Sequence, residues 1–353
     1  MKLSALTALT GATFLVISMA SQAQSKPAEK PVFPSGVPVI QVPFADDNLS
    51  FQHLNSIHLN LSFNGGPASR FQVDTGSVGI MVGADEIPGF DGKGEPGEIT
   101  YSSSGVHLTG VWTTVDVGFP DAHMPDGSPV VAHMKVLAVT HKECLGIGVN
   151  EAKCSPGPAH PHMLGIGFGR GKDDEYTTAL RNAFLMLNAM QKGSMRRGYT
   201  ITPHGVQLGL NAESITGDWK WQKLAPRKVE VPDSYNGPHD WTTAAGTINV
   251  ENKQLSMGTV LIDTGLTNMM ISSPGAPETG SIPDGVPIKV SLLGGQLGYE
   301  FSVGSKHDPE TPNKVNWRAP HAETFVNTGL RALAHFDYCY DADAGFLGLK
   351  YRP

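Results

Sequence analysis

The sequence is poor in charged residues and has no dense basic cluster. Only 17% of its 353 residues are charged, and Asp plus Glu (33) outnumber Lys plus Arg (26), for a formal net charge of −7. No run of basic residues is dense enough to follow a phosphate backbone, so we expect no nucleic-acid partner. Hydrophobic residues make up 40% of the chain, which is enough for a sizeable core and excludes a disordered protein.

Beyond the N-terminus the sequence also lacks a long hydrophobic run. The apolar stretch Leu3–Met19 follows Lys2, and the small residues Ser21 and Ala23 are spaced as at a signal-peptidase site. We therefore predict a signal peptide over residues 1–23. The predicted location is exported, either periplasmic or secreted, with no membrane attachment after the signal is cleaved.

Cysteine is scarce, with three residues in the chain. In an oxidising compartment Cys144 and Cys154, which lie close together in a Gly-rich segment, would form a local disulfide and leave Cys339 unpaired. The alternative is a metal site that combines both cysteines with His160 and His162. No Cys-x-x-Cys spacing supports that alternative, so we predict the disulfide and no metal.

Glycine and proline are abundant instead, at 41 and 26 residues, which is typical of short strands joined by many turns. Residues 57–63 alternate apolar and polar side chains, the pattern of a half-buried strand. Residues 176–191 contain no Gly or Pro and predict a single amphipathic helix. Further strands are predicted at 71–73, 115–117, 134–139, 206–210, 247–250, 260–262, 288–293 and 338–340.

One short motif occurs in both halves of the chain. Asp74-Thr75-Gly76 and Asp263-Thr264-Gly265 each follow an apolar strand end, 189 residues apart. This separation is too long for a solenoid repeat and indicates two related lobes. We place the N-terminal lobe at residues 37–205 and the C-terminal lobe at 206–353, after a flexible leader at 24–36.

The repeated motif allows two interpretations. Each copy can be an ordinary tight turn in which Asp accepts backbone hydrogen bonds. If the two turns meet instead, Asp74 and Asp263 are pressed together, share one proton and titrate as a coupled pair. One carboxyl group can then activate a bound water as a base, while the other protonates a carbonyl oxygen as an acid.

With these motifs the sequence resembles the pepsin-like aspartic proteases. Residues 99–105 and the strand-like residues that follow are similar to the flap hairpin of that family, and Tyr101 falls where the flap tyrosine is expected. Met163–Gly167 resembles the strand beneath the first catalytic loop, and 336–349 resembles the closing hairpin. The resemblance implies an all-β, bilobal, pepsin-like double barrel with a central active-site cleft and few short helices.

The resemblance also implies a role for each matching residue. The two aspartates would be catalytic, the two threonines would brace the dyad, and the two glycines would hold the turns. Ser77 would hydrogen-bond the outer oxygen of Asp74, and the flap would contact substrate. The implied site residues are Asp74, Asp263, Thr75, Gly76, Ser77, Thr264, Gly265, Tyr101, Ser102 and Ser103.

The sequence departs from the family pattern at several positions. Leu266 stands where a second serine would support Asp263, and neighbouring Thr267 is a possible substitute donor. Met81 replaces the tryptophan that supports the flap, and Ser102 replaces a glycine. The second threading strand, at 326–329, is unusually polar.

The expected function is an aspartic endopeptidase that needs no cofactor and cleaves a peptide or protein bound in extended conformation, as a monomer. The alternative is a peptide-binding or protein-binding module with the same fold and little or no catalysis, because a fold does not fix function.

Overall fold

The computed structural model describes residues 29–46, 50–51, 54–101, 103–146, 154–157, 159–170 and 177–352. The predicted signal peptide, the first part of the predicted leader and the predicted flap residue Ser102 lie outside these ranges. Within them, no helix is long and apolar enough to cross a membrane.

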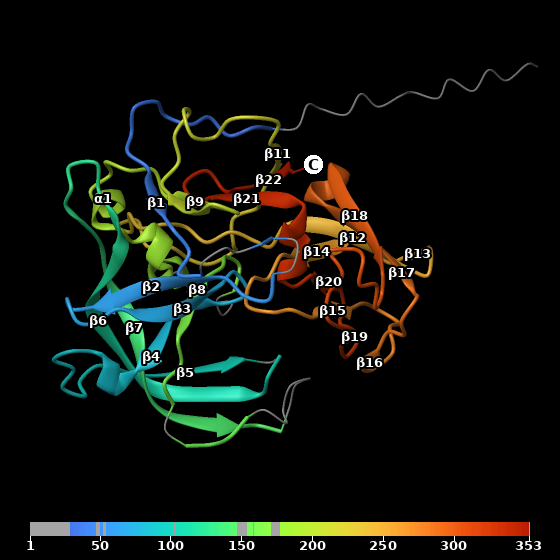
Figure 1. Ribbon diagram of the computed structural model, residues 1–353, viewed down its shortest axis with the longest axis horizontal. Coiled ribbons are helices and arrows are strands. Elements are labelled where there is room, and N and C mark those ends of the chain that lie inside the picture. Colours follow the sequence, from blue (N-terminus) through green and yellow to red (C-terminus); the bar gives the residue numbers. More distant parts are fainter. Residues whose placement is uncertain are drawn as a thin grey trace, which may run out of the picture.

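The chain is all-β and bilobal, as predicted (Figure 1). A seven-stranded sheet in the N-terminal half has the order β2-β3-β8-β4-β7-β6-β5. Its strands are β2 (His58–Phe63), β3 (Ser69–Asp74), β4 (Val78–Gly83), β5 (Glu95–Tyr101), β6 (Val106–His123), β7 (Pro129–Cys144) and β8 (Met163–Ile166).

A nine-stranded sheet occupies the C-terminal half. Its order is β16-β19-β15-β20-β14-β12-β17-β18, with β13 paired to β12. Its strands are β12 (Ala245–Val250), β13 (Lys253–Gln254), β14 (Gly258–Leu261), β15 (Met269–Ser272), β16 (Gly280–Ser281), β17 (Pro287–Leu292), β18 (Leu297–Ser302), β19 (Val315–Trp317) and β20 (Thr324–Asn327).

A six-stranded sheet takes strands from both halves, in the order β1-β10-β9-β21-β22-β11. Its strands are β1 (Ile40–Val42), β9 (Gly198–Thr202), β10 (Gly205–Leu208), β11 (Lys220–Lys223), β21 (Phe336–Asp341) and β22 (Phe346–Tyr351). The predicted lobe boundary, at residue 205, falls beside the turn between β9 and β10, inside this sheet. The placement of that boundary stays a prediction.

The two halves share a local topology around the repeated motif. In the N-terminal half β3 pairs in parallel with β8, β8 pairs antiparallel with β4, and β4 pairs in parallel with β7. The strands β14, β20, β15 and β19 repeat this sequence of parallel, antiparallel and parallel pairings. Each half therefore presents its Asp-Thr-Gly turn at the end of an equivalent strand.

The single helix predicted over 176–191 is wrong. The described part of this segment contains η3 (Thr178–Arg181), η4 (Ala183–Leu185) and α1 (Asn188–Gln191), which are separated by extended residues at Asn182 and Leu187. Residues 183–187 are all buried, and five consecutive buried residues cannot lie on one face of a helix. Elsewhere in the described residues the short helices are η1 (Ala84–Glu86), η5 (Leu293–Gly295) and η6 (Leu330–Ala334).

Aromatic side chains fill the core where the six-stranded sheet meets the N-terminal half. The buried ring of Tyr199 lies 5.1 Å from that of Phe184 and 5.7 Å from that of Tyr340. Tyr340 also stacks on Phe168, with ring centroids 4.2 Å apart. Because Phe168 follows β8 directly, this packing fixes the strand that lies beside the first Asp-Thr-Gly turn.

Candidate active site

The two repeated turns meet in the structure. A β-carbon built on Gly76 would lie 2.4 Å from the carboxyl carbon of Asp263, and one on Gly265 would lie 2.4 Å from Oδ1 of Asp74. Any other residue would therefore collide with the aspartate of the opposite turn, and glycine is required for the close approach. Each motif is thus a tight turn whose Asp accepts a backbone hydrogen bond, and the two turns also meet.

The two threonines cross-link the turns reciprocally. The backbone N–H of Thr75 donates to Oγ1 of Thr264 at 3.0 Å, and the N–H of Thr264 donates to Oγ1 of Thr75 at 3.0 Å. Each hydroxyl then donates across the interface, to the carbonyl oxygens of Ile262 (2.6 Å) and Val73 (2.7 Å). All these groups are satisfied without water, which holds the turns in fixed register.

Asp74 is held by its own turn. The backbone N–H of Gly76 donates to Oδ1 at 2.7 Å, and the hydroxyl of Ser77 donates to Oδ2 at 2.5 Å. The residues predicted around Asp74 therefore lie where the sequence interpretation placed them.

Asp263 receives the equivalent bonds from different residues. The N–H of Gly265 donates to Oδ1 at 2.9 Å, as in the first turn. The donor to Oδ2 is the side-chain amide of Asn327, at 2.5 Å, rather than Leu266 or Thr267. The orientation of this amide is set by the N–H of Gly329, which donates to Asn327 Oδ1 at 3.0 Å.

Sequence reasoning missed Asn327 as a site residue. It ends β20, which pairs in parallel with β14, and Leu261 and Asn327 are register partners just before the second motif. The available signal was the unusual polarity of residues 326–329, because a polar residue in an otherwise apolar threading strand needs a partner.

The dyad is buried and electrostatically coupled. Asp74 and Asp263 are only 4% and 8% exposed. Burial, followed by the negative charge of Asp263, raises the pKa of Asp74 to about 8, against the opposing hydrogen bonds from Ser77 and Gly76. A proton therefore stays on Asp74 through the neutral range.

Arg170 places a buried positive charge near the dyad, against residues of the C-terminal half. Burial lowers the pKa of its guanidinium, and the charges of Asp263 and Asp240 act against that effect. The guanidinium also lies over the ring of Phe325, 5.5 Å from its centroid. The Arg170 charge thus lies within electrostatic reach of both carboxyl groups of the dyad.

The dyad lies in a cleft of about 1150 Å³ that is lined by both halves of the chain. This volume is large for a small-molecule pocket and can hold a stretch of extended peptide. Residues that line it from the N-terminal half include Gln72, Ser77, Tyr101, Ser103, Trp112 and His162, and those from the C-terminal half include Leu266, Met270, Arg318, Phe325 and Asn327.

A hairpin of β5 and β6 covers the cleft. Tyr101 ends β5 and is the register partner of Val106, and the N–H of Gly105 donates to the Tyr101 carbonyl at 2.8 Å across the tip. The Tyr101 hydroxyl is buried beside Ser77 and makes no hydrogen bond of normal geometry with the described residues. Burial, followed by the charge of Asp74, raises its pKa, so the phenol stays protonated beside the dyad.

Met81 stands where the family resemblance implied a tryptophan. It lies in a small core beneath this hairpin. Met81 is fully buried in a cluster with Leu108 and Trp112, and Tyr101 packs against that cluster. The indole ring in this cluster is that of Trp112, from β6. Tyr101 therefore packs on a tryptophan that comes from β6 and not from the Met81 position on β4.

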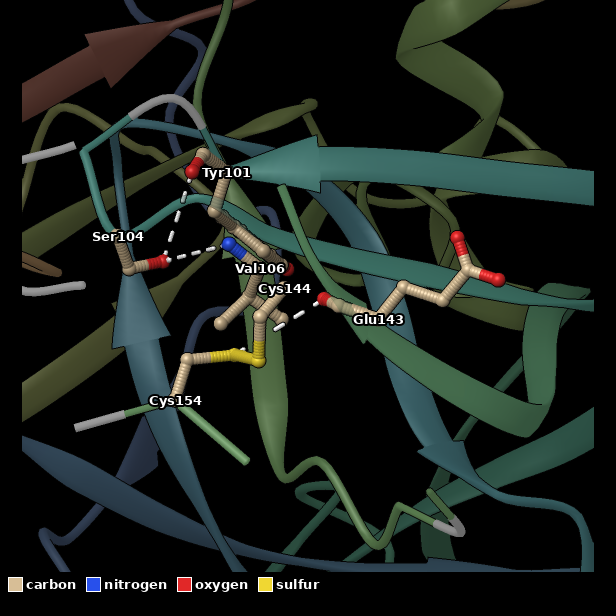
Figure 2. Close-up of a disulfide and its surroundings, with 6 residues drawn as sticks. All are labelled: Tyr101, Ser104, Val106, Glu143, Cys144 and Cys154. Carbon is tan, nitrogen blue, oxygen red and sulfur yellow. Dashed lines mark hydrogen bonds between the residues drawn. A yellow bond between two sulfur atoms is a disulfide. The ribbon is translucent and has the colours of Figure 1, made fainter. Parts of the chain in front are cut away.

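The predicted disulfide between Cys144 and Cys154 is present and lies beside the tip of the hairpin (Figure 2). It joins the end of β7 to the segment that leads into β8, and Cys144 is the register partner of Val106. Because both thiols are used, the alternative metal site with two cysteine ligands is excluded. Cys339 is unpaired and buried on β21.

Comparison of the chain with protein-family models and with curated proteins found no match. The cleft itself offers two coupled carboxyl groups, one of which carries a proton, below a tyrosine-bearing hairpin. Such a pair can act as base and acid in one step.

Proposed function

We propose that the chain is an exported, pepsin-like aspartic endopeptidase in which Asp74 and Asp263 hydrolyse a peptide bond with an activated water. The observation that carries this proposal is the buried dyad on the floor of the two-sided cleft, with each carboxyl group held by one backbone and one side-chain donor.

The two side-chain donors support a division of labour. The Asn327 amide can only donate to Asp263, so it stabilises the carboxylate form. The Ser77 hydroxyl can donate or accept, so it can follow Asp74 as that group gains and loses its proton. Asp263 is therefore the base and Asp74 the acid at the start of the reaction.

Hydrolysis then needs no further co-reactant. The water oxygen attacks the peptide carbonyl carbon while Asp263 takes a proton from that water. Asp74 gives its own proton to the carbonyl oxygen. In the second step Asp263 passes its proton to the peptide nitrogen, and the C–N bond breaks. A hydroxyl proton of the tetrahedral intermediate returns to Asp74, which regenerates the starting state.

The shape of the cleft supports an extended substrate. A peptide that runs between the lobes can pair with strand edges and place one carbonyl group over the dyad. The hairpin with Tyr101 would close over it and exclude bulk water from the reacting bond.

The Asn327 hydrogen bond favours hydrolysis over the binding-module alternative. That alternative rests on the departures at Leu266 and Met81. The donor absent at Leu266 is supplied by Asn327 from another strand, and Trp112 supplies an indole beside Met81.

The test is cleavage of an unfolded protein by the purified chain from Gln24 onward, over the pH range of about 3 to 9. We expect Asp74→Asn and Asp263→Asn each to lower the rate by more than about 10³-fold, because the two groups act as a unit. Melting curves of each variant control for folding. A folded wild-type chain that cleaves nothing in this range, or aspartate variants that still cleave, would disprove the proposal.

Export is tested separately by sequencing the N-terminus of the protein made from the full chain. A mature N-terminus at Gln24 is expected, and an intact N-terminus would contradict the signal peptide.

A further inference from the structure

A second group of titratable side chains lies on the wall of the cleft, away from the dyad. Asp85 and Glu86 belong to η1, which follows β4, and His160 lies just before β8. One ligand atom from each of the three residues lies within 4.8 Å of the other two. His160 and His162 line the cleft, and the two carboxylates lie against these histidines at its edge.

The distances in the cluster fit shared metal coordination better than direct hydrogen bonds. Nδ1 of His160 lies 3.3 Å from Oδ1 of Asp85 and 3.4 Å from Oε1 of Glu86. A charged N–H···O bond is normally about 2.7–2.9 Å long. Two ligand atoms on a tetrahedral zinc ion lie about 3.3 Å apart, because each is about 2.0–2.1 Å from the metal.

The three ligand atoms also face a common space over Gly83. A β-carbon on Gly83 would lie 2.7 Å from Glu86 Oε1, 2.8 Å from His160 Nδ1 and 3.0 Å from Asp85 Oδ1. Gly83 has ordinary backbone angles (φ −57°, ψ 134°), so the backbone does not require glycine. The missing side chain therefore leaves room where the three ligand atoms converge.

One oxygen of Glu86 is without a hydrogen bond. Oε1 is shielded from solvent although the Glu86 side chain is 23% exposed, and it makes no hydrogen bond with the described residues; its ion-pair partner is Nδ1 of His160, at 3.4 Å. The other oxygen, Oε2, lies 2.6 Å from Nε2 of His162, whose ring packs on Phe71 with centroids 4.8 Å apart. His162 thus fixes the carboxylate with Oε1 turned toward His160, as outer partners orient metal ligands.

We propose that Asp85, Glu86 and His160 bind a divalent transition-metal ion such as Zn²⁺, with His162 as the partner that orients Glu86. An imidazole with two carboxylates suits Zn²⁺, whereas Ca²⁺ takes six to eight oxygen ligands. Three protein ligands leave a fourth position for water or another group. The ion would join η1 to the segment that runs from Cys154 to β8, and so brace the wall of the cleft.

The experiment is titration of the tag-free chain with Zn²⁺ by calorimetry, together with absorption spectra of the Co²⁺-loaded protein. We expect one Zn²⁺ per chain and Co²⁺ bands of a tetrahedral site. His160→Ala and Gly83→Ala should each weaken Zn²⁺ binding by more than about tenfold. Gly83→Ala keeps all the ligand atoms, but its methyl group displaces them. His162→Ala should weaken binding by about 10-fold to 100-fold.

The matched control is His141→Ala. His141 lies 3.7 Å from Glu143, an exposed pair of the same chemistry without a third ligand, so its removal should leave Zn²⁺ affinity unchanged. Melting curves in chelator check that each variant folds, and Asp85→Asn replaces any variant that does not. Absence of Zn²⁺ binding, or equal binding by wild type and His160→Ala, would overturn the proposal. The site is independent of peptide hydrolysis, so Asp74→Asn should still bind Zn²⁺.

Discussion

The two halves of the dyad start from the same turn and differ in how they hold the outer carboxylate oxygen. Oδ2 of Asp74 is bound by Ser77, three residues further along the chain. Oδ2 of Asp263 is bound by Asn327, 64 residues further along the chain and on a neighbouring strand. The same hydrogen bond thus comes from different residue types in the two turns, so equivalent contacts do not require an equivalent local sequence.

Among the changes that test this comparison, removal of the unmatched donor should have the largest effect. Asn327→Ala should lower kcat/KM by about 10-fold to 100-fold, because a hydrogen bond to a charged group contributes about 1.5–3 kcal/mol. Ser77→Ala should cause a similar loss if the two donors are equivalent. Steady-state cleavage of a peptide substrate measures both.

A second substitution sharpens the same comparison. Leu266 occupies the position in the second motif that Ser77 occupies in the first, so Leu266→Ser in the Asn327→Ala background should recover most of the lost rate. Asn249→Ala, on β12 and outside the cleft lining, is the control. Wild-type activity in Asn327→Ala would show that Asp263 does not need this bond.

The threonine cross-link is the symmetric part of the comparison. Thr75→Val and Thr264→Val each leave a buried N–H and a buried carbonyl unpaired, and each should lower the free energy of unfolding by about 1–3 kcal/mol. The double variant should cost less than the sum, because the bonds are reciprocal. Urea unfolding measures these values, and a large cost for only one threonine would break the symmetry.

The pH dependence should follow Asp74. Its pKa rises from 3.8 to about 8 on folding, so the folded chain keeps a proton that the unfolded chain releases. This contribution to stability is complete below pH 4 and is lost progressively as the pH rises to about 8. Peptide cleavage should likewise fall above about pH 8, since it needs the protonated form.

Two variants check this assignment. Unfolding of wild type and Asp74→Asn should show that the substitution removes this part of the stability loss between pH 5 and 8. Ser77→Ala should move the alkaline limb of cleavage to higher pH, because the Ser77 hydrogen bond lowers the pKa of Asp74. An unchanged limb would assign it to another group.

The smallest effect on stability and cleavage should come from the hairpin of β5 and β6, which belongs to the N-terminal half. The Tyr101 hydroxyl is buried beside Ser77 and makes no hydrogen bond of normal geometry with the described residues, so Tyr101→Phe should leave the melting temperature nearly unchanged. Tyr101→Ala should lower the cleavage rate more than Tyr101→Phe does, because it removes the ring that packs on the cluster around Trp112. Equal losses in both variants would show that the hydroxyl, rather than the ring, is important.

The features that the sequence predicted well are local. Alternating residues 57–63 correspond to β2, and the 189-residue separation of two identical turns matches the repeated pairing of β3, β8, β4 and β7 by β14, β20, β15 and β19. The disulfide followed from two cysteines close together in the chain. Each of these depends on neighbours in sequence or on a recognisable repeat.

The features that could not be predicted depend on strands that are distant in sequence. Asn327 donates to Asp263 only because β20 lies beside β14; the polarity of residues 326–329 marks the segment as unusual but does not indicate which residue it contacts. The histidines at 160 and 162 were grouped with cysteines by proximity in the chain, whereas folding places them against η1. The prediction of a single helix over 176–191 was wrong because tertiary packing buries consecutive side chains there.

The six-stranded sheet has a consequence for how the protein is made. β9 pairs on one side with β10, which in turn pairs with β1, and on the other with β21, so strands from near both ends of the described chain complete one sheet. During synthesis the first half cannot close this sheet until the last hairpin, β21 and β22, has left the ribosome. A chain released before β21 is made would thus expose an unpaired β9 edge.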